Sequence, residues 1–316
     1  MAPSRITGRP VPSGGTTSAL VRILEIAGVL LVVSFVVLAG AAAFLTYRVT
    51  TEHNDVEDVT PASFLLTSTE DVSFTTPNGG EHKGWLLRGL RGAPVILICH
   101  GYGTNRSDGL SLGTVLQENH FNVYLFNFRG SKKMSSMSDL GPSYIETLKA
   151  AIQKVTSVEG VNPRRVGLMG RTTGGYAALG AAEQSPLVKV LVVDSVYETP
   201  DQMLDSQISS LLGGASSGFF HGLAEGEFHL LAASAHPPNI RAGIAELGGV
   251  PKLFIAGRDS PDLMVTTEYL YQQAPQPKQM LIQEHTQLIF ANESEKREYE
   301  NAVLDFFLHN LPQRAD

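Results

Sequence analysis

The sequence predicts an α/β protein with a mostly parallel central sheet and helices on both faces. Short, mostly apolar runs such as residues 94–99, 121–128 and 188–194 recur along the chain, and segments with helical spacing lie between them. Strands that are apolar on both sides are typical of parallel sheets buried between two helix layers. With 316 residues, of which 43% are hydrophobic, the chain is long enough to bury such a core.

The amino-terminal part predicts a tail and a membrane anchor. Residues 1–18 are rich in Pro, Ser, Gly and Thr, so they cannot bury enough apolar surface to fold and are predicted to be a disordered cytoplasmic tail. Residues 19–48 are predicted to be one transmembrane helix. No charge occurs between residues 26 and 47, and a helix of that length crosses the ~30 Å hydrocarbon layer.

A cleaved signal peptide is the alternative interpretation of this segment, because the small residues at 39–43 could form a cleavage site and the rest would then be secreted. Basic residues are more frequent on the amino-terminal side of the span, where Arg5, Arg9 and Arg22 precede it, than on the other side, where Arg48 alone follows it. The positive-inside rule therefore predicts a cytoplasmic amino terminus and an extracytoplasmic main domain.

Residues 49–69 are predicted to be a linker, and residues 70–312 the main domain. The domain begins with an antiparallel pair, residues 71–77 and 83–88, joined by a turn at Pro77-Asn-Gly-Gly80. The predicted strands that follow are 94–99, 121–128, 165–169, 188–194, 251–256 and 278–283, and the predicted helices are 110–118, 143–157, 174–184, 262–273 and 293–310.

Residues 197–250 interrupt this alternation with Gly, Ser, His and Pro, which predicts an excursion that caps one edge of the sheet. Ligands of such sheets bind at the carboxyl ends of the strands. The aromatic and apolar residues Tyr102, Phe219, Phe220 and Leu223 could line an apolar pocket there, or could simply pack within the cap.

Several classes of function have no support in the sequence. A net charge of −7 and a pI near 5.7 argue against nucleic acid as a partner. The single cysteine, Cys99, excludes an internal disulfide framework. No cofactor is expected, since no Gly-x-Gly-x-x-Gly or phosphate loop follows a strand, and no metal, since His221 and His229 lack a His-Glu-x-x-His spacing. The sequence contains no feature that identifies a protein partner.

One tight strand-to-helix turn, Gly170-Arg-Thr-Thr-Gly174, has the pattern of a nucleophile elbow. In such a turn two glycines let strand and helix approach, and the residue between them exposes its oxygen at the apex. That residue is Thr172 here, and a β-branched side chain is a poor choice for the positive φ of the apex. By itself, the pattern favours an ordinary glycine-rich turn between a strand and a helix.

Other motifs occur in a matching order and extend this pattern. They are His100-Gly-Tyr-Gly-Thr-Asn105 after a strand, Phe126-Asn-Phe-Arg-Gly130, the approach from Val161 to Gly170, Asp194-Ser195, Phe254 to Asp259, and Gln283-Glu-His285. Over about residues 70–311 the chain resembles the α/β-hydrolase superfamily, and in particular membrane-anchored or exported bacterial members of its serine-aminopeptidase and acyl-hydrolase branches. Asn127 stands where that family has an aspartate, and Thr172 where it has the nucleophilic serine.

The resemblance implies a role for each motif. Thr172 would be the nucleophile, His285 the base and Asp259 the acid that orients it, in the chain order of that superfamily. The backbone N–H groups of Tyr102 and Thr173 would form the oxyanion hole. His100 and Gly101 would belong to the oxyanion loop, with Gly170 and Gly174 shaping the elbow.

Position along the predicted sheet supports two of these residues independently. Asp259 and His285 each follow a strand at its carboxyl end, and one helix and one strand separate them, which brings both to the same edge. Asp262 is the second candidate acid, and Asp194 is expected to be a structural hydrogen-bonding residue. The alternative for His285 is a loop histidine without a partner, and the alternative for Asp259 is a cap of the helix that follows it.

Three functional hypotheses remain open at this stage. The first is a membrane-anchored hydrolase of carboxylic esters, other acyl compounds or peptides, with a Thr172, His285 and Asp259 triad. The second is an inactive pseudohydrolase that binds or scaffolds. The third is a hydrolase or transferase with another nucleophile in the same cleft.

Overall fold

The structure is a computed structural model, and it describes residues 15–50, 59–77, 80–128, 130, 141–212, 222, 226, 240–286 and 290–312. Several sequence-based predictions fall outside these residues. They concern the tail before residue 15, the centre of the hairpin turn at Asn78 and Gly79, and the cap residues Phe219, Phe220, His221, Leu223, Glu225, Glu227 and His229.

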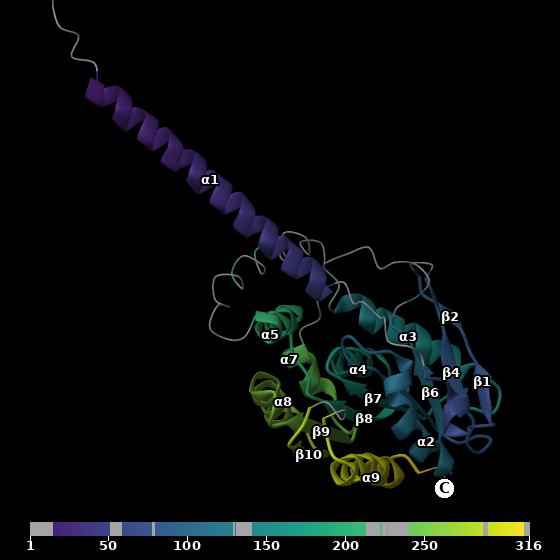
Figure 1. The fold of residues 1–316 in the computed structure, drawn as a ribbon. Coiled ribbons are helices and arrows are strands. Elements are labelled where there is room, and N and C mark those ends of the chain that lie inside the picture. Colours follow the sequence, from purple (N-terminus) through teal and green to yellow (C-terminus); the bar gives the residue numbers. More distant parts are fainter. Residues whose placement is uncertain are drawn as a thin grey trace, which may run out of the picture.

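The predicted mostly parallel sheet is confirmed. Eight strands form it in the order β1-β4-β6-β5-β7-β8-β9-β10, and all pairs from β6 to β10 are parallel (Figure 1). Its strands are β1 (Thr69–Asp71), β4 (Gly84–Leu87), β5 (Val95–Cys99), β6 (Asn122–Phe126), β7 (Val166–Arg171), β8 (Val188–Asp194), β9 (Lys252–Gly257) and β10 (Lys278–Gln283).

Helices cover both faces of this sheet, as the apolar strands predict. The helices after the membrane-length helix are α2 (Leu110–Glu118), α3 (Pro142–Thr156), α4 (Thr173–Gln184), α5 (Pro200–Leu212), α7 (Ile240–Gly243), α8 (Pro261–Gln273) and α9 (Glu293–Asn310), with short 3-10 turns η1 (Pro61–Phe64), η2 (Arg106–Gly109) and η3 (Ile244–Glu246). Alternate strand residues face opposite layers: Val95 and Leu97 pack with α3 and α4, whereas Ile96 and Ile98 pack with α2 and α9.

The predicted antiparallel pair at the start of the domain is split in two. β1 pairs with β4 in the main sheet, whereas β2 (Phe74–Thr75) and β3 (Glu81–His82) form a separate two-stranded ribbon. At the break, the carbonyl of Val72 accepts a hydrogen bond from the Tyr124 hydroxyl at 2.8 Å. Gly84 leaves room for that ring, because a Cβ there would lie 2.3 Å from the same hydroxyl oxygen.

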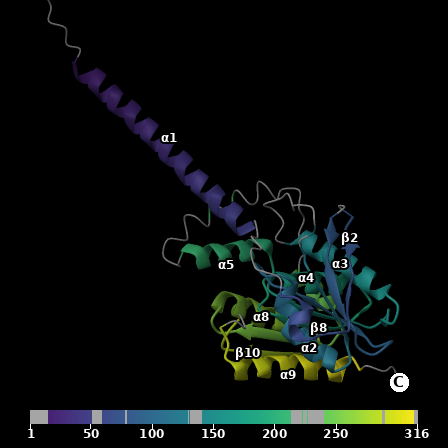
Figure 2. The same cartoon turned by 45° about the vertical axis from the view of Figure 1, so that its right-hand side comes forward.

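The amino-terminal helix α1 (Gly15–Thr50) projects from the body (Figures 1 and 2). It begins before and ends after the predicted residues 19–48. Among the described residues it is the one helix that is long and apolar enough to cross a membrane, over Ala19–Phe44. A signal anchor and a signal peptide both have this character.

Candidate active site

The elbow at the end of β7 has the predicted shape. Thr172 lies between β7 and α4 with φ of 43° and ψ of −108°. A Cβ at Gly170 would lie 2.3 Å from the Gly174 carbonyl oxygen, and a Cβ at Gly174 would lie 2.3 Å from the Cys99 carbonyl oxygen. Only glycine permits these approaches. A non-glycine residue in such a conformation costs about 1–3 kcal/mol, so the fold holds Thr172 under strain.

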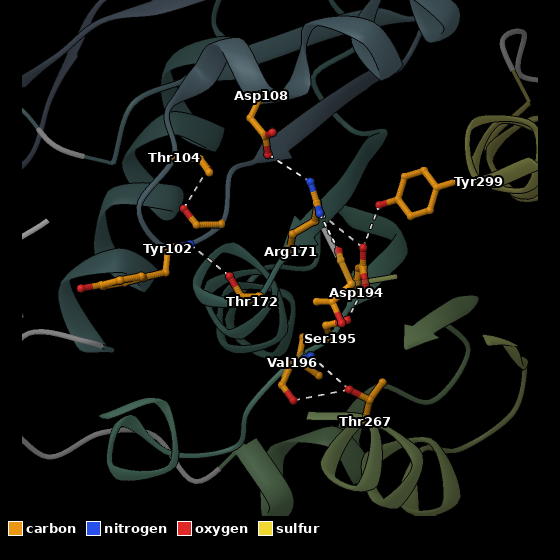
Figure 3. Close-up of polar contacts among 12 residues, drawn as sticks. Tyr102, Thr104, Asp108, Arg171, Thr172, Asp194, Ser195, Val196, Thr267 and Tyr299 are labelled. Atoms are coloured by element: carbon orange, nitrogen blue, oxygen red, sulfur yellow. Dashed lines mark hydrogen bonds and ion pairs between the residues drawn. The ribbon is translucent and has the colours of Figure 1, made fainter. Parts of the chain in front are cut away.

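The hydroxyl of Thr172 faces the loop after β5 (Figure 3). Its Oγ1 accepts a hydrogen bond from the N–H of Tyr102 at 3.0 Å, and its own N–H donates to the Asp194 carbonyl at 2.9 Å. A Cβ at Gly101 would lie 2.9 Å from this Oγ1, so a larger residue there would push the loop away. The hydroxyl of the candidate nucleophile and one predicted oxyanion donor are therefore in direct contact.

The second predicted donor, Thr173, is the first residue of α4 and is 1% exposed. Within the described part of the chain its N–H has no hydrogen-bond acceptor. Helix amino-terminal N–H groups carry partial positive charge and favour an anion. The N–H groups of Tyr102 and Thr173 thus flank Thr172 from two different elements, which is the arrangement that stabilises a developing oxyanion.

His100 is buried and has a structural role in this loop. Its Nε2 accepts from the Phe128 N–H at 3.2 Å, so the other nitrogen, Nδ1, carries the proton and donates to the Gly101 carbonyl at 2.9 Å. Asn127, where the family has an aspartate, accepts from the Arg106 N–H at 2.8 Å. Both residues hold the loop that carries Tyr102 against the end of β6.

His285 follows β10 and is half-exposed, and its partner is not the predicted acid. Its Nδ1 lies 3.1 Å from Oε2 of Glu295, and the same Oε2 accepts from the Asn292 N–H at 3.1 Å. Asn292 and Glu295 form the capping box that starts α9. The local signal Asn292-Glu-Ser-Glu295 is visible in the sequence, but it indicates only a helix start, so sequence reasoning missed this acid.

Asp259 is exposed and binds the residue beside His285. Its Oδ1 accepts from both the N–H and the hydroxyl of Thr286, each at 2.6 Å. Ser260, not Asp259, occupies the N-cap position of α8 and makes no side-chain cap hydrogen bond, and the Asp259 carboxylate binds Thr286 instead of the helix. Asp262 lies exposed in the first turn of α8. Among the described residues, no hydrogen bond joins His285 to Thr172, Asp259 or Asp262.

Arg171 connects the separate parts of the site and was also missed from the sequence. Its guanidinium lies 3.1 Å from Asp108 and 3.4 Å from Asp194, and it donates to the Thr286 carbonyl at 2.7 Å (Figure 3). Asp108 lies in η2 after the Tyr102 loop, Asp194 ends β8, and Thr286 follows His285. Arg171, a largely buried cation with a 15% exposed side chain, therefore connects the Tyr102 loop and the His285 loop to the start of the elbow.

Asp194 is buried at its strand end and hydrogen-bonded, as predicted. It accepts from the Ser195 hydroxyl at 2.8 Å and from the Tyr299 hydroxyl at 3.0 Å. Burial raises the pKa of Asp194, while the Arg171 guanidinium and the two hydroxyl donors lower it by less. Burial also raises the pKa of the Cys99 thiol, in line with an inert core residue rather than a nucleophile.

Possible metal ligands are not grouped in the described part of the chain. No group of three or more His, Cys, Asp or Glu side chains that could hold a metal ion occurs there. The N–H of Tyr102 reaches the Thr172 hydroxyl, whereas His285 and Glu295 form a separate pair after β10.

Comparisons with known proteins bear on the fold of the chain. No protein-family model matches the chain. It is 26% identical to the uncharacterized protein YfhR of Escherichia coli K12 over 254 residues, which cover 77% of this chain and 82% of that protein.

Two solved structures show the same fold. An esterase of Pyrococcus furiosus superposes with a TM-score of 0.66 at 18% identity, covering 83% of this chain and 98% of the esterase. An α/β hydrolase from Penicillium, GrgF, superposes with a TM-score of 0.57 at 18% identity, covering 77% and 99%. The chain therefore has the α/β-hydrolase fold, and it is hydrolase-like in architecture.

Proposed function

We propose that this protein is a membrane-anchored hydrolase of carboxylic esters in which Thr172 is the nucleophile and His285 the base. The observation that carries the proposal is the position of the Thr172 hydroxyl, at the strained apex of the elbow and 3.0 Å from the Tyr102 N–H. Strain of this kind persists where the surrounding structure enforces it, and it clusters at functional sites.

The reaction follows the chemistry of these groups. A rotation of the Thr172 side chain moves its hydroxyl from the Tyr102 N–H toward His285, which takes the proton as Oγ1 attacks the ester carbonyl carbon. The N–H groups of Tyr102 and Thr173 stabilise the oxyanion. The C–O bond to the alcohol breaks, and the alcohol leaves with the proton from His285. Water then attacks the carbonyl carbon of the acyl-threonine while His285 takes one of its protons. The bond between that carbon and Oγ1 breaks, His285 returns the proton to Oγ1, and the carboxylic acid leaves.

The acid that orients His285 is assigned here to Glu295, with Asp259 as the alternative. Glu295 supports the assignment through its 3.1 Å contact with Nδ1. Asp259 acts on the neighbouring Thr286, and a change of side-chain conformation would be needed to bring its carboxylate to the imidazole. In either case a carboxylate on Nδ1 leaves Nε2 as the atom that receives the proton.

Membrane anchoring through α1 is part of the proposal, with the amino terminus in the cytoplasm and the hydrolase domain outside. The basic residues before the span support this orientation. The packing of the helix supports retention over cleavage, because Ala42, within the possible cleavage site, is fully buried.

A second candidate function is an inactive pseudohydrolase that binds an acyl compound. It is favoured by the methyl group of Thr172, which crowds the apex, and by the absence of a hydrogen bond between Thr172 and His285 in the described part of the chain. Two further alternatives, a peptide substrate and a different nucleophile, have no support at the elbow among the described residues.

Hydrolysis of p-nitrophenyl esters by the full chain tests these alternatives. The ester-hydrolase proposal predicts turnover that Thr172→Ala and His285→Ala both abolish. Equal turnover in the wild type and both variants would overturn it. A wild type without turnover, together with a large gain in Thr172→Ser, would support the pseudohydrolase, since only the nucleophile would then be defective.

A further inference from the structure

The membrane-length helix is covered at one place only in the part that the structure describes. Most of Ala19–Phe44 is exposed, but residues 38, 39 and 41–43 are partly or fully covered, and Ala42 is 0% exposed. Helix α5 contacts α1, and both views show the two side by side near the end of α1 (Figures 1 and 2). The covered residues are mostly alanines, which allow two helices to approach closely.

The length of the span places this contact at the membrane surface. About 20 helical residues cross the hydrocarbon layer. Counted from Ala19, the crossing ends near Leu38, and counted from Ile26, after the last charge, it ends near Leu45. At a rise of about 1.5 Å per residue, Ala42 lies within about 6 Å of the hydrocarbon boundary in both cases. Helix α5 is therefore held at the level of the lipid head groups.

The contacts of α5 connect it to the elbow. The segment that enters α5 carries Tyr197, whose ring stacks on Tyr176 of α4 at 5.1 Å with an interplanar angle of 10°. The N–H of Tyr176 donates to the Thr172 carbonyl at 2.9 Å. Pro200, which starts α5, lies beside Gly141 at the beginning of α3. The start of α3, the start of α4 and the start of α5 all lie at the carboxyl edge of the sheet.

We propose that the substrate is a long-chain acyl ester resident in the bilayer, which enters the site from the membrane surface beside α5. The inference rests on the proposed ester-hydrolase function and specifies its substrate class. The starts of α3 and α5 lie at the same edge of the sheet as Thr172, and α5 also contacts α1, so this edge is the one nearest to the end of the span (Figure 1). A substrate dissolved in that leaflet reaches the elbow at a high local concentration, and its acyl chain remains in apolar surroundings until the ester meets Thr172.

The test uses the full chain in phosphatidylcholine vesicles with two substrates, p-nitrophenyl acetate in solution and a fluorogenic oleoyl ester in the bilayer. Ala42→Leu places a larger side chain at the fully buried position of α1, near the end of the helix that lies beside α5 (Figure 1). Gly40→Leu is the matched control, because a Cβ at Gly40 meets nothing within 4 Å. Both variants add the same apolar bulk near the end of the span.

Ala42→Leu is expected to lower the rate of hydrolysis of the bilayer ester by about tenfold or more, which is the scale of a lost effective concentration. Its rate of acetate hydrolysis should equal that of the wild type. Gly40→Leu should hydrolyse both substrates at the wild-type rate. Equal hydrolysis of the bilayer ester by the two variants would overturn the inference. So would a wild type that hydrolyses acetate but not the bilayer ester. A wild type that hydrolyses neither substrate would overturn the ester-hydrolase function, and the substrate class with it.

Discussion

The two halves of the candidate site are built with very different rigidity. The donor half, made of Gly101, Tyr102, Arg171, Thr172 and Thr173, combines close glycine contacts with a buried ion network. The base half, made of Asp259, His285, Thr286 and Glu295, lies in a loop and at a helix start, and the side chains of His285 and Glu295 are 36% and 31% exposed. The fold therefore fixes the N–H groups of the donor half in place, whereas the side chains of the base half are free to change conformation.

This contrast has a consequence for how activity could be lost or kept. The backbone that carries the donor half tolerates little change, because Gly170 and Gly174 are needed for the close approach of β7, α4 and the end of β5. An intact donor half is therefore expected of an active enzyme and of a pseudohydrolase alike. The two differ in whether Thr172 and His285 work together, so variants at these two residues carry more information about function than variants at the elbow glycines.

The largest effect is expected for Arg171→Met, which removes the cation of the donor half. Asp194 is 3% exposed in its side chain, so the substitution leaves a buried carboxylate without its charged partner. Loss of one partner of a buried pair costs about 3–5 kcal/mol in the free energy of unfolding. Urea unfolding of the variant measures this loss.

Arg258→Met provides the matched control for that measurement. Arg258 pairs with Glu284 next to the same histidine loop, but the two side chains are 57% and 65% exposed. An exposed pair contributes about 0–1 kcal/mol. Similar losses in Arg171→Met and Arg258→Met would contradict the view that the donor half is held by a buried network.

The next effect concerns the choice of acid in the base half. Glu295→Gln is expected to lower kcat by about tenfold to a hundredfold, because the imidazole loses the charge that orients it and stabilises its protonated form. Asp259→Asn should instead loosen the loop at Thr286 with a smaller effect on kcat. Steady-state kinetics with a soluble ester decides between them.

Asn292→Ala separates the two roles of Glu295. It removes the other side chain of the capping box and so costs about 1 kcal/mol of stability, but it leaves the Glu295 carboxylate in place for His285. If Asn292→Ala lowers kcat as much as Glu295→Gln does, the effect comes from the helix start, and Glu295 is not the orienting acid. If Asp259→Asn has the larger effect on kcat, the acid is Asp259.

The sequence predicted the sheet and the elbow because their signals are local. Continuous apolar runs and paired glycines each act within a few residues, and the structure has the strands where those runs occur. Arg171 and Glu295 could not be found in this way. The partners of Arg171 are Asp108, Asp194 and Thr286, which only the folded sheet brings together. The split of β1 from β2 likewise depends on Tyr124, a residue far away in the chain.

A smaller effect, of opposite sign, is expected for Thr172→Gly in the donor half. The φ of 43° strains a threonine by about 1–3 kcal/mol, and glycine removes that strain while it loses about 0.5–1 kcal/mol through its greater freedom in the unfolded chain. The variant should therefore be about 1 kcal/mol more stable than the wild type and inactive toward esters. Thr114→Gly, inside α2, is the control and should be less stable than the wild type. If Thr172→Gly also lost stability, the apex of the elbow would be unstrained.

The smallest effect separates the pH response of the fold from that of the base half. Burial and, to a lesser extent, Glu246 raise the pKa of Glu183 in α4 from 4.5 to about 7. Between these values the folded protein keeps a proton that the unfolded chain has lost, so the free energy of unfolding falls as the pH rises through that window. In Glu183→Gln this decline should be weaker, and urea unfolding at pH 5 and pH 8 measures it. An unchanged decline would assign the pH dependence of the free energy of unfolding to other groups. Those groups would then have to be replaced before the pH profile of ester hydrolysis could be attributed to His285.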